Sequence, residues 1–126
     1  MIKKAKFLAK EAKLRLNYMT NKGCLFCKII NREVKTEFVA ESKKSAAFLD
    51  ANPVNKTHIL IVPKRHIESV LTLEKSDAED LLDMYNVAKE LIAKNRLDGF
   101  RLTFNGGKLQ HVPHLHMHLI AGEKLI

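Results

Sequence analysis

Apolar and polar residues alternate along this chain in a way that separates short strand-like runs from one long helical run. Residues 57–62 are rich in β-branched side chains and stop at Pro63, which predicts a largely buried strand. Two runs that flank a polar Ser-Lys-Lys-Ser turn predict a hairpin. Five runs in all are expected as strands: 37–41, 46–50, 57–62, 100–104 and 114–120.

The long helical pattern begins near Ser76 and ends at Asp98-Gly99. Ser76 is expected as the N-cap, and acidic residues in the first turn and basic residues in later turns suit the helix dipole. A second, short helix is expected over residues 26–30. The predicted buried stripe of the long helix comprises Leu81, Leu82, Tyr85, Val87, Ala88, Leu91 and Ile92.

The positive charge of the chain is concentrated at its amino terminus. Of a net charge of +8 over 126 residues, residues 1–22 carry +6, so the remaining residues are nearly neutral and no specific nucleic-acid partner is expected. Residues 1–22 are predicted to be a basic helical arm and residues 23–126 a single domain. The arm fits a solvated helix docked by its apolar side, a contact with an acidic surface, or an organellar targeting helix.

The composition is typical of a globular protein, with 46% hydrophobic and 29% charged residues. No apolar run approaches the roughly 18 residues of a membrane span, and no signal-peptide pattern is found. The expected compartment is the cytoplasm.

Both cysteines of the chain lie in one Cys24-Leu-Phe-Cys27 step. This spacing suits a shared metal or a redox pair in a reducing compartment better than a structural disulfide. Thiolate and imidazole together are the ligands of tetrahedral zinc. A redox pair, or two buried small apolar residues, remains the alternative.

The six histidines fall in two places, His58 and His66 around the third expected strand, and four between residues 111 and 118. On a strand, His114, His116 and His118 share one face, with successive rings about 6–7 Å apart. Such a row fits a metal site, a proton-transfer array or a nucleophile with helpers, because neutral imidazole serves all three purposes. A plain polar strand face is the alternative.

Two further positions are candidates for ligand binding. Asp50 ends a strand before a proline-containing loop, where its carboxylate suits two ribose hydroxyls, or caps the loop by binding backbone amides. The turn Asn105-Gly-Gly107 lets backbone amides approach a phosphate, or is simply a tight turn.

Four ordered motifs resemble the histidine-triad (HIT) family, closest to its Hint-like bacterial branch with a zinc-type CxxC, over about residues 24–122. They are Cys24-Leu-Phe-Cys-Lys-Ile-Ile, Ala47-Phe-Leu-Asp, His58-Ile-Leu-Ile-Val-Pro-Lys-Arg-His and Gln110-His-Val-Pro-His-Leu-His-Met-His. The resemblance implies an α+β fold, with a five-stranded antiparallel sheet, one long and one short helix, and a two-fold homodimer.

The same resemblance implies hydrolysis or transfer of a nucleotide at its α-phosphate. His116 would be the nucleophile that forms a nucleotidyl-histidine, and His118 would bind phosphate oxygens. A purine nucleoside phosphoramidase acting on a purine nucleotide conjugate is expected. A dinucleoside polyphosphate hydrolase or nucleotidylyltransferase, a non-catalytic nucleotide-binding or interaction module, and a pure zinc-binding module are the alternatives.

Relatives that bind zinc imply a structural site made of Cys24, Cys27, His66 and His114, with no ligand position left for water. No organic cofactor is expected. The alternative is that both histidines are metal-free and hydrogen-bonded. The resemblance also assigns nucleotide-binding positions to Phe48, Asp50, His58, Asn105 and Gln110.

This chain departs from the family pattern at two places near the expected phosphate site. His111 stands where the family usually has Ser or Thr, whose hydroxyl assists the leaving group, so an imidazolium would have to donate that proton. The loop from Asn105 to Gln110 is shorter than is usual, with Leu109 in place of Gly. The preference among leaving groups and the binding of phosphate are therefore expected to differ.

Overall fold

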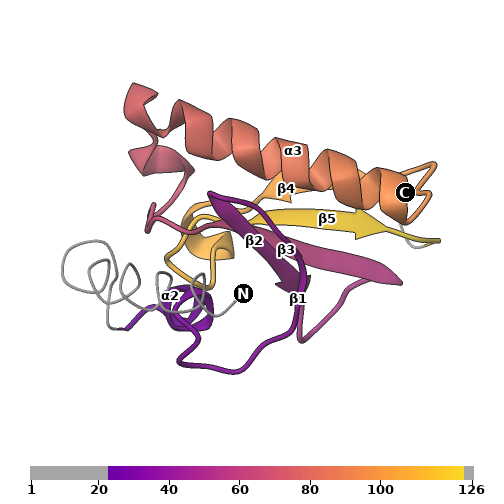
Figure 1. Cartoon of the computed structure of the whole chain (residues 1–126), viewed down its shortest axis with the longest axis horizontal. Coiled ribbons are helices and arrows are strands. Elements are labelled where there is room, and N and C mark those ends of the chain that lie inside the picture. Colours follow the sequence, from indigo (N-terminus) through magenta and orange to yellow (C-terminus); the bar gives the residue numbers. More distant parts are fainter. Residues whose placement is uncertain (1–22, 124–126) are drawn as a thin grey trace, which may run out of the picture.

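The computed structural model describes residues 23–123, and the predicted basic arm, residues 1–22, lies outside the described residues (Figure 1). The helices are α2 (Leu25–Ile30) and α3 (Ala78–Lys94), with 3-10 turns η1 (Val70–Thr72), η2 (Lys75–Asp77) and η3 (Gly107–Leu109). The strands are β1 (Phe38–Glu41), β2 (Ser45–Leu49), β3 (Thr57–Pro63), β4 (Arg101–Phe104) and β5 (Met117–Ala121). All five expected strands and both expected helices of this region are present.

The strands form one antiparallel sheet in the order β1-β2-β3-β5-β4, which confirms the expected α+β fold. β3 is paired on both sides, which explains why its sequence is an almost continuous apolar run. β5 pairs with β3 in a register that sets Leu60 opposite His118 and Ile61 opposite Met117. The histidine strand therefore lies inside the sheet rather than at an edge.

The two faces of the sheet carry separate apolar clusters. α3 lies across one face, where Ile59, Ile61 and Met117 pack under its Met84 and Leu91 (Figure 1). The alternate residues of β2 and β3 point to the other face and pack with α2; this second cluster includes Phe26, Cys27, Ala46, Phe48, Leu60 and Val62. The short helix is thus held against the face opposite α3.

The buried face of α3 differs from the predicted stripe. Leu82 and Tyr85 are 62% and 40% exposed, whereas Met84 is fully buried. The helix has apolar residues over more than one face, and the buried set repeats at i, i+4, i+7 and i+11: Asp80, Met84, Val87, Ala88 and Leu91. Packing on the sheet selects this narrower stripe.

Two element starts were also wrong. Ser76 lies within η2 and does not cap α3, whose N-cap is Asp77. β5 begins at Met117 instead of His114, because Pro113 has no backbone N–H to donate and the next residues bond elsewhere: His114 N–H to Val112 O, and Leu115 N–H to Ile67 O.

Buried ion pairs attach the loop after β3 to α3. The Arg65 guanidinium donates to Asp77, and to Asp80 at 2.8 Å, and both carboxylates are nearly inaccessible to solvent. The backbone N–H of Glu74 and the Arg65 guanidinium lower the pKa of Asp77. We call these ion pairs the Arg65 clamp. Because His66 directly follows Arg65, the clamp also fixes the position of the His66 backbone.

Within the described residues, no helix is both long enough and apolar enough to cross a bilayer.

Candidate active site and metal centre

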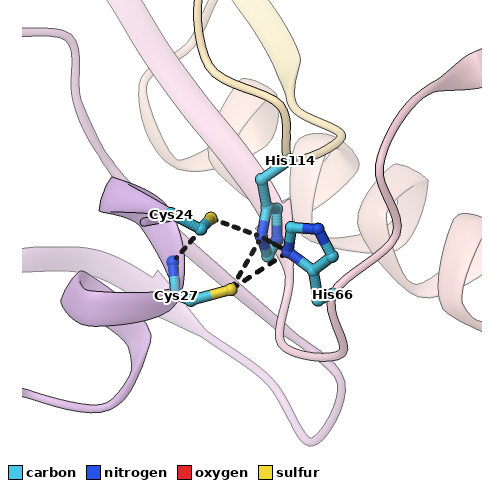
Figure 2. A group of neighbouring side chains, drawn as sticks. All are labelled: Cys24, Cys27, His66 and His114. Atoms are coloured by element: carbon cyan, nitrogen blue, oxygen red, sulfur yellow. Dashed lines mark hydrogen bonds between the residues drawn. The ribbon is translucent and has the colours of Figure 1, made fainter. Parts of the chain in front are cut away.

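Four side chains from three distant segments meet at the amino end of α2: Cys24, Cys27, His66 and His114 (Figure 2). Their potential ligand atoms all lie within 4.8 Å of one another. The His66 Nδ1 to His114 Nδ1 distance is 3.1 Å, and Cys27 Sγ lies 3.1 Å from His66 Nδ1 and 3.4 Å from His114 Nδ1. The sequence motifs therefore predicted the correct four neighbours.

These distances suit one tetrahedral ion. Bond lengths of about 2.0–2.1 Å to nitrogen and about 2.3 Å to sulfur give nitrogen–nitrogen and nitrogen–sulfur edges of about 3.3 and 3.6 Å. The cluster is slightly tighter than that, and a small outward movement of the side chains would fit the metal. The donor set, two thiols and two imidazoles, is the one that zinc prefers.

The protonation of His114 also suits a metal ligand. Its Nε2 lies 2.8 Å from the carbonyl oxygen of Pro63, which only accepts, so Nε2 carries the proton and Nδ1 keeps its lone pair toward the cysteines. Cys24 is the N-cap of α2, and its sulfur accepts the Cys27 N–H at 3.2 Å. Hydrogen bonds from the Cys27 thiol and from the Cys27 backbone N–H lower the pKa of the Cys24 thiol, which favours the thiolate that a metal binds.

The three triad histidines do not form a regular row. Residues 114–116 precede the strand, and the ring centroids of His116 and His118 are 4.9 Å apart, closer than the predicted spacing. His114 belongs to the cysteine–histidine cluster, while the rings of His116 and His118 are tilted toward each other. The segment thus serves two sites.

A hydrogen bond to the backbone fixes the tautomer of His116. Its Nδ1–H donates to the carbonyl oxygen of His114 at 2.7 Å, so the lone pair is on Nε2. The residue is 7% exposed, and burial lowers the pKa of His116, although the hydrogen bond to the His114 carbonyl opposes part of this effect. The ring is therefore neutral near pH 7.

A chain of hydrogen bonds fixes the proton of His118. The Val54 N–H donates to His58 Nδ1 at 3.1 Å, so His58 carries its proton on Nε2. This N–H donates to His118 Nδ1 at 2.8 Å, which leaves the His118 proton on Nε2. Burial, together with His116 and His58, lowers the pKa of His118 to about 4. His118 is thus a neutral donor beside His116.

Asp50, His58 and His118 also lie close enough together to suggest a second metal site. Binding through His58 Nε2 would require its proton to move to Nδ1, which already accepts the Val54 N–H. The hydrogen bonds therefore favour a proton-sharing group over a metal site.

The other predicted nucleotide-binding residues lie near His118 and His58 or in the second apolar cluster. The Asn105 amide lies 3.3 Å from His118 Nε2, and after the side-chain amide is turned by 180° its oxygen accepts the His118 proton. Asp50 accepts the Asn52 N–H at 2.8 Å and lies 3.3 Å from His58 Nε2, so the loop-capping interpretation is observed. Phe48 is buried in the second cluster.

Two predicted residues are less clearly placed. Gln110 donates its amide to the carbonyl oxygens of Glu68 and Val112, and so holds the loop. His111 is exposed, and in its protonated form it would lower the pKa of His116.

Three contributors to the site were not predicted from the sequence: the Pro63 carbonyl, the Val54 amide and the Phe26 ring. The first two are backbone groups, which every residue type offers and no motif marks. The position of Phe26 between the two cysteines could have indicated that its side chain belongs to the site.

The fold and the site together define an α+β hydrolase built around a histidine array, and comparisons with known proteins agree. The family model described as "Scavenger mRNA decapping enzyme C-term binding" matches residues 23–124. A histidine triad protein structure from Clostridium difficile is 37% identical with a TM-score of 0.81, covering 86% of this chain and 97% of that one.

Two further relatives point the same way. A HIT family hydrolase structure from Legionella pneumophila is 38% identical with a TM-score of 0.79, covering 82% of this chain and 96% of that one. The adenosine 5′-monophosphoramidase of Saccharomyces cerevisiae is 40% identical over 78% of this chain, which spans 61% of that protein. The chain belongs to the histidine-triad (HIT) family.

Proposed function

We propose that this protein hydrolyses purine nucleoside phosphoramidates at the α-phosphate through a covalent nucleotidyl-histidine on His116. The observation that carries the proposal is the 2.7 Å bond from His116 Nδ1 to the His114 carbonyl, because it leaves a neutral Nε2 lone pair facing away from the backbone. A neutral imidazole held in one tautomer is a competent nucleophile. The yeast relative's name supports the choice of a phosphoramidate.

The reaction has two displacements at phosphorus. In the first, His116 Nε2 attacks phosphorus, the bond between phosphorus and the leaving nitrogen breaks, and that nitrogen takes the electron pair of the bond and a proton from the His111 imidazolium. In the second, water attacks phosphorus, the bond to Nε2 breaks with its electron pair returning to Nε2, and the proton of water passes to the now neutral His111. The first step leaves His116 as a cationic nucleotidyl-imidazolium, and the second step returns it to its neutral form.

His118 is the hydrogen-bond donor on the phosphate side in this scheme. Its ring lies 4.9 Å from the ring of His116, and the His58 Nε2–H donates to its Nδ1 at 2.8 Å. A neutral hydrogen-bond donor stabilises the negative charge that develops on phosphate oxygens without repelling the protonated leaving amine. Asn105 and Gln110 complete the phosphate side, and His111 serves the leaving group in place of a hydroxyl.

The nucleoside end of the site comprises Phe48 for the base and Asp50 for the ribose hydroxyls. A bound ribose would share the Asp50 carboxylate with the Asn52 N–H and His58. An ionised carboxylate offers about four lone-pair sites, so two of them remain for the ribose hydroxyls.

Zinc held by Cys24, Cys27, His66 and His114 would be structural. The four ligands close a tetrahedron without an open position, and the ion would tie α2 to the segment before β5. A reducing, cytoplasmic compartment suits thiols that serve as metal ligands. A homodimer, with no nucleic acid or membrane as partner, completes the proposal.

Turnover of adenosine 5′-phosphoramidate and of diadenosine polyphosphates by wild type and His116→Ala tests the function. We expect phosphoramidate to be preferred, the variant to lose at least about a thousandfold in kcat, and a nucleotidyl adduct to be found by mass spectrometry on wild type alone. Equal turnover by both proteins would exclude the covalent step. Preference for a diadenosine polyphosphate would change the proposed substrate class but leave the covalent mechanism in place.

A further inference from the structure

Phe26 lies between the two cysteines and reaches the nucleophile. It belongs to α2, its residue is 5% exposed, and its ring packs edge-on against His116 at 4.9 Å between centroids and 82° between planes. The same ring contacts His114 at 6.1 Å and Phe48 at 5.6 Å. Phe26, within the CxxC motif, therefore contacts the proposed nucleophile, a histidine of the cysteine–histidine cluster and the predicted base-binding residue.

The hydrogen bond to the His114 carbonyl restrains only one atom of the His116 ring. An imidazole held at Nδ1 can still pivot about that bond, and such a pivot moves the attacking Nε2. Contacts on the ring itself must prevent this movement. The tilted ring of His118, at 4.9 Å, lies beside it, and the edge-on Phe26 ring is the other aromatic neighbour.

We infer that Phe26 is a positioning residue through which the Cys24–Cys27–His66–His114 cluster fixes the orientation of the His116 imidazole. This inference rests on the proposed function, in which Nε2 of that ring attacks phosphorus. Edge-to-face aromatic pairs are directional, with centroids typically about 4.5–7 Å apart. The Phe26 ring thus sets an angle as well as filling space.

The position of Phe26 depends on the cysteines on either side of it. α2 has six residues, fewer than an isolated helix needs to persist in water. Its placement comes from the apolar packing of the second cluster and from the ligands at its amino end. When those ligands hold a common ion, Phe26 has little freedom relative to His114, and so to His116.

Phe26→Leu tests the inference, with Ile29→Val as the matched control. Ile29 is in the same helix and the same apolar cluster, is 6% exposed, and has no part in the site. For Phe26→Leu we expect kcat for adenosine 5′-phosphoramidate to fall about tenfold with KM changed less than about twofold, because a misplaced nucleophile slows the chemistry more than binding. Ile29→Val should keep both constants, and zinc content should be unchanged in both.

A second measurement does not depend on turnover. In protein with 15N-labelled histidine, the His116 Nδ1–H, bonded to the His114 carbonyl, should give a slowly exchanging proton signal in wild type and Ile29→Val. Phe26→Leu should shift or broaden this signal, and so should removal of the metal from wild type with a chelator. If Phe26→Leu fails to fold, Phe26→Met takes its place, because the flexible methionine side chain adapts to the same space without the aromatic ring, and we expect the same loss of kcat and the same change in the proton signal.

An unchanged kcat, a rise in KM alone, or loss of zinc from the Phe26 variants would each overturn the positioning role. An Nδ1–H signal that is insensitive to both Phe26 and the metal would overturn the coupling. If wild type cleaves no phosphoramidate, the proposed function fails while the proton signal still decides whether Phe26 orients the ring.

Discussion

Acidification should destabilise this protein through His118. Burial beside two other imidazoles lowers the pKa of His118 from 6.5 to about 4. In the unfolded chain the ring binds a proton near pH 6.5, so between these values the unfolded state holds more protons than the folded state. The stability that His118 contributes is therefore complete above about pH 6.5 and is lost as the pH falls toward 4.

The expected size follows from the two pKa values. Between about pH 7.5 and pH 4.5, linkage gives a loss of about 2.5 kcal/mol for this one group. Such a loss is a large part of the stability of a small domain, which is about 5–15 kcal/mol. The residue is 9% exposed, so little solvent screening reduces the effect.

Urea denaturation of wild type and His118→Gln across this pH range measures the effect. Glutamine does not titrate, but it can still accept the His58 N–H. Loss of metal in acid affects both proteins, so the difference between their pH dependences isolates His118. We expect wild type to lose about 2.5 kcal/mol more than the variant on acidification. Parallel curves for the two proteins would refute the depressed pKa.

Three other expectations can be tested by unfolding measurements. Removing metal with a chelator should lower the melting temperature by at least about 5 °C, because metal binding adds to folding free energy; scanning calorimetry with and without zinc would show this, and an unchanged transition would contradict a bound structural ion. Gly122→Ala should lower the free energy of unfolding, measured by urea denaturation, by about 2 kcal/mol or more, because φ is +139° and the new Cβ would lie 2.8 Å from Asn55 Cγ. A loss below about 0.5 kcal/mol would disprove the close approach. Arg65→Met should lower the free energy of unfolding by about 3 kcal/mol, because Asp77 and Asp80 would stay buried without their cation. Adding Asp80→Leu to Arg65→Met should recover part of that loss. Equal stability of wild type and the single variant would show that the Arg65 clamp is dispensable.

The strands could be predicted because their sequences carry local signals. Residues 57–62 form an apolar run that ends at Pro63, and the structure buries nearly all of it in a strand paired on both sides. The buried face of α3 could not be predicted, since apolar residues at 81, 82, 84 and 85 offer several faces and only the sheet selects one. The start of β5 depends on bonds from residues 114–115 to distant or non-strand partners.

The identity of the site residues could be predicted better than their arrangement. Cys24, Cys27, His66 and His114 followed from motif resemblance, and the structure brings them together. Their protonation could not be predicted, because it depends on the Pro63 carbonyl and the Val54 amide. The spacing of the His116 and His118 rings could not be predicted either, because residues 114–116 precede the strand and do not follow the strand geometry on which the prediction relied.

The long sequence separation within the cysteine–histidine cluster has a consequence for synthesis of the chain. Cys24 and His114 are 90 residues apart, with His66 between them. A ribosome releases the amino end first, at about 5–20 residues per second, so the cysteines wait for seconds before their last partner emerges. Until then, an ion can bind only an incomplete set of ligands. Completion of the centre therefore requires that the chain has been made at least through residue 114 and that the segment before β5 lies against α2.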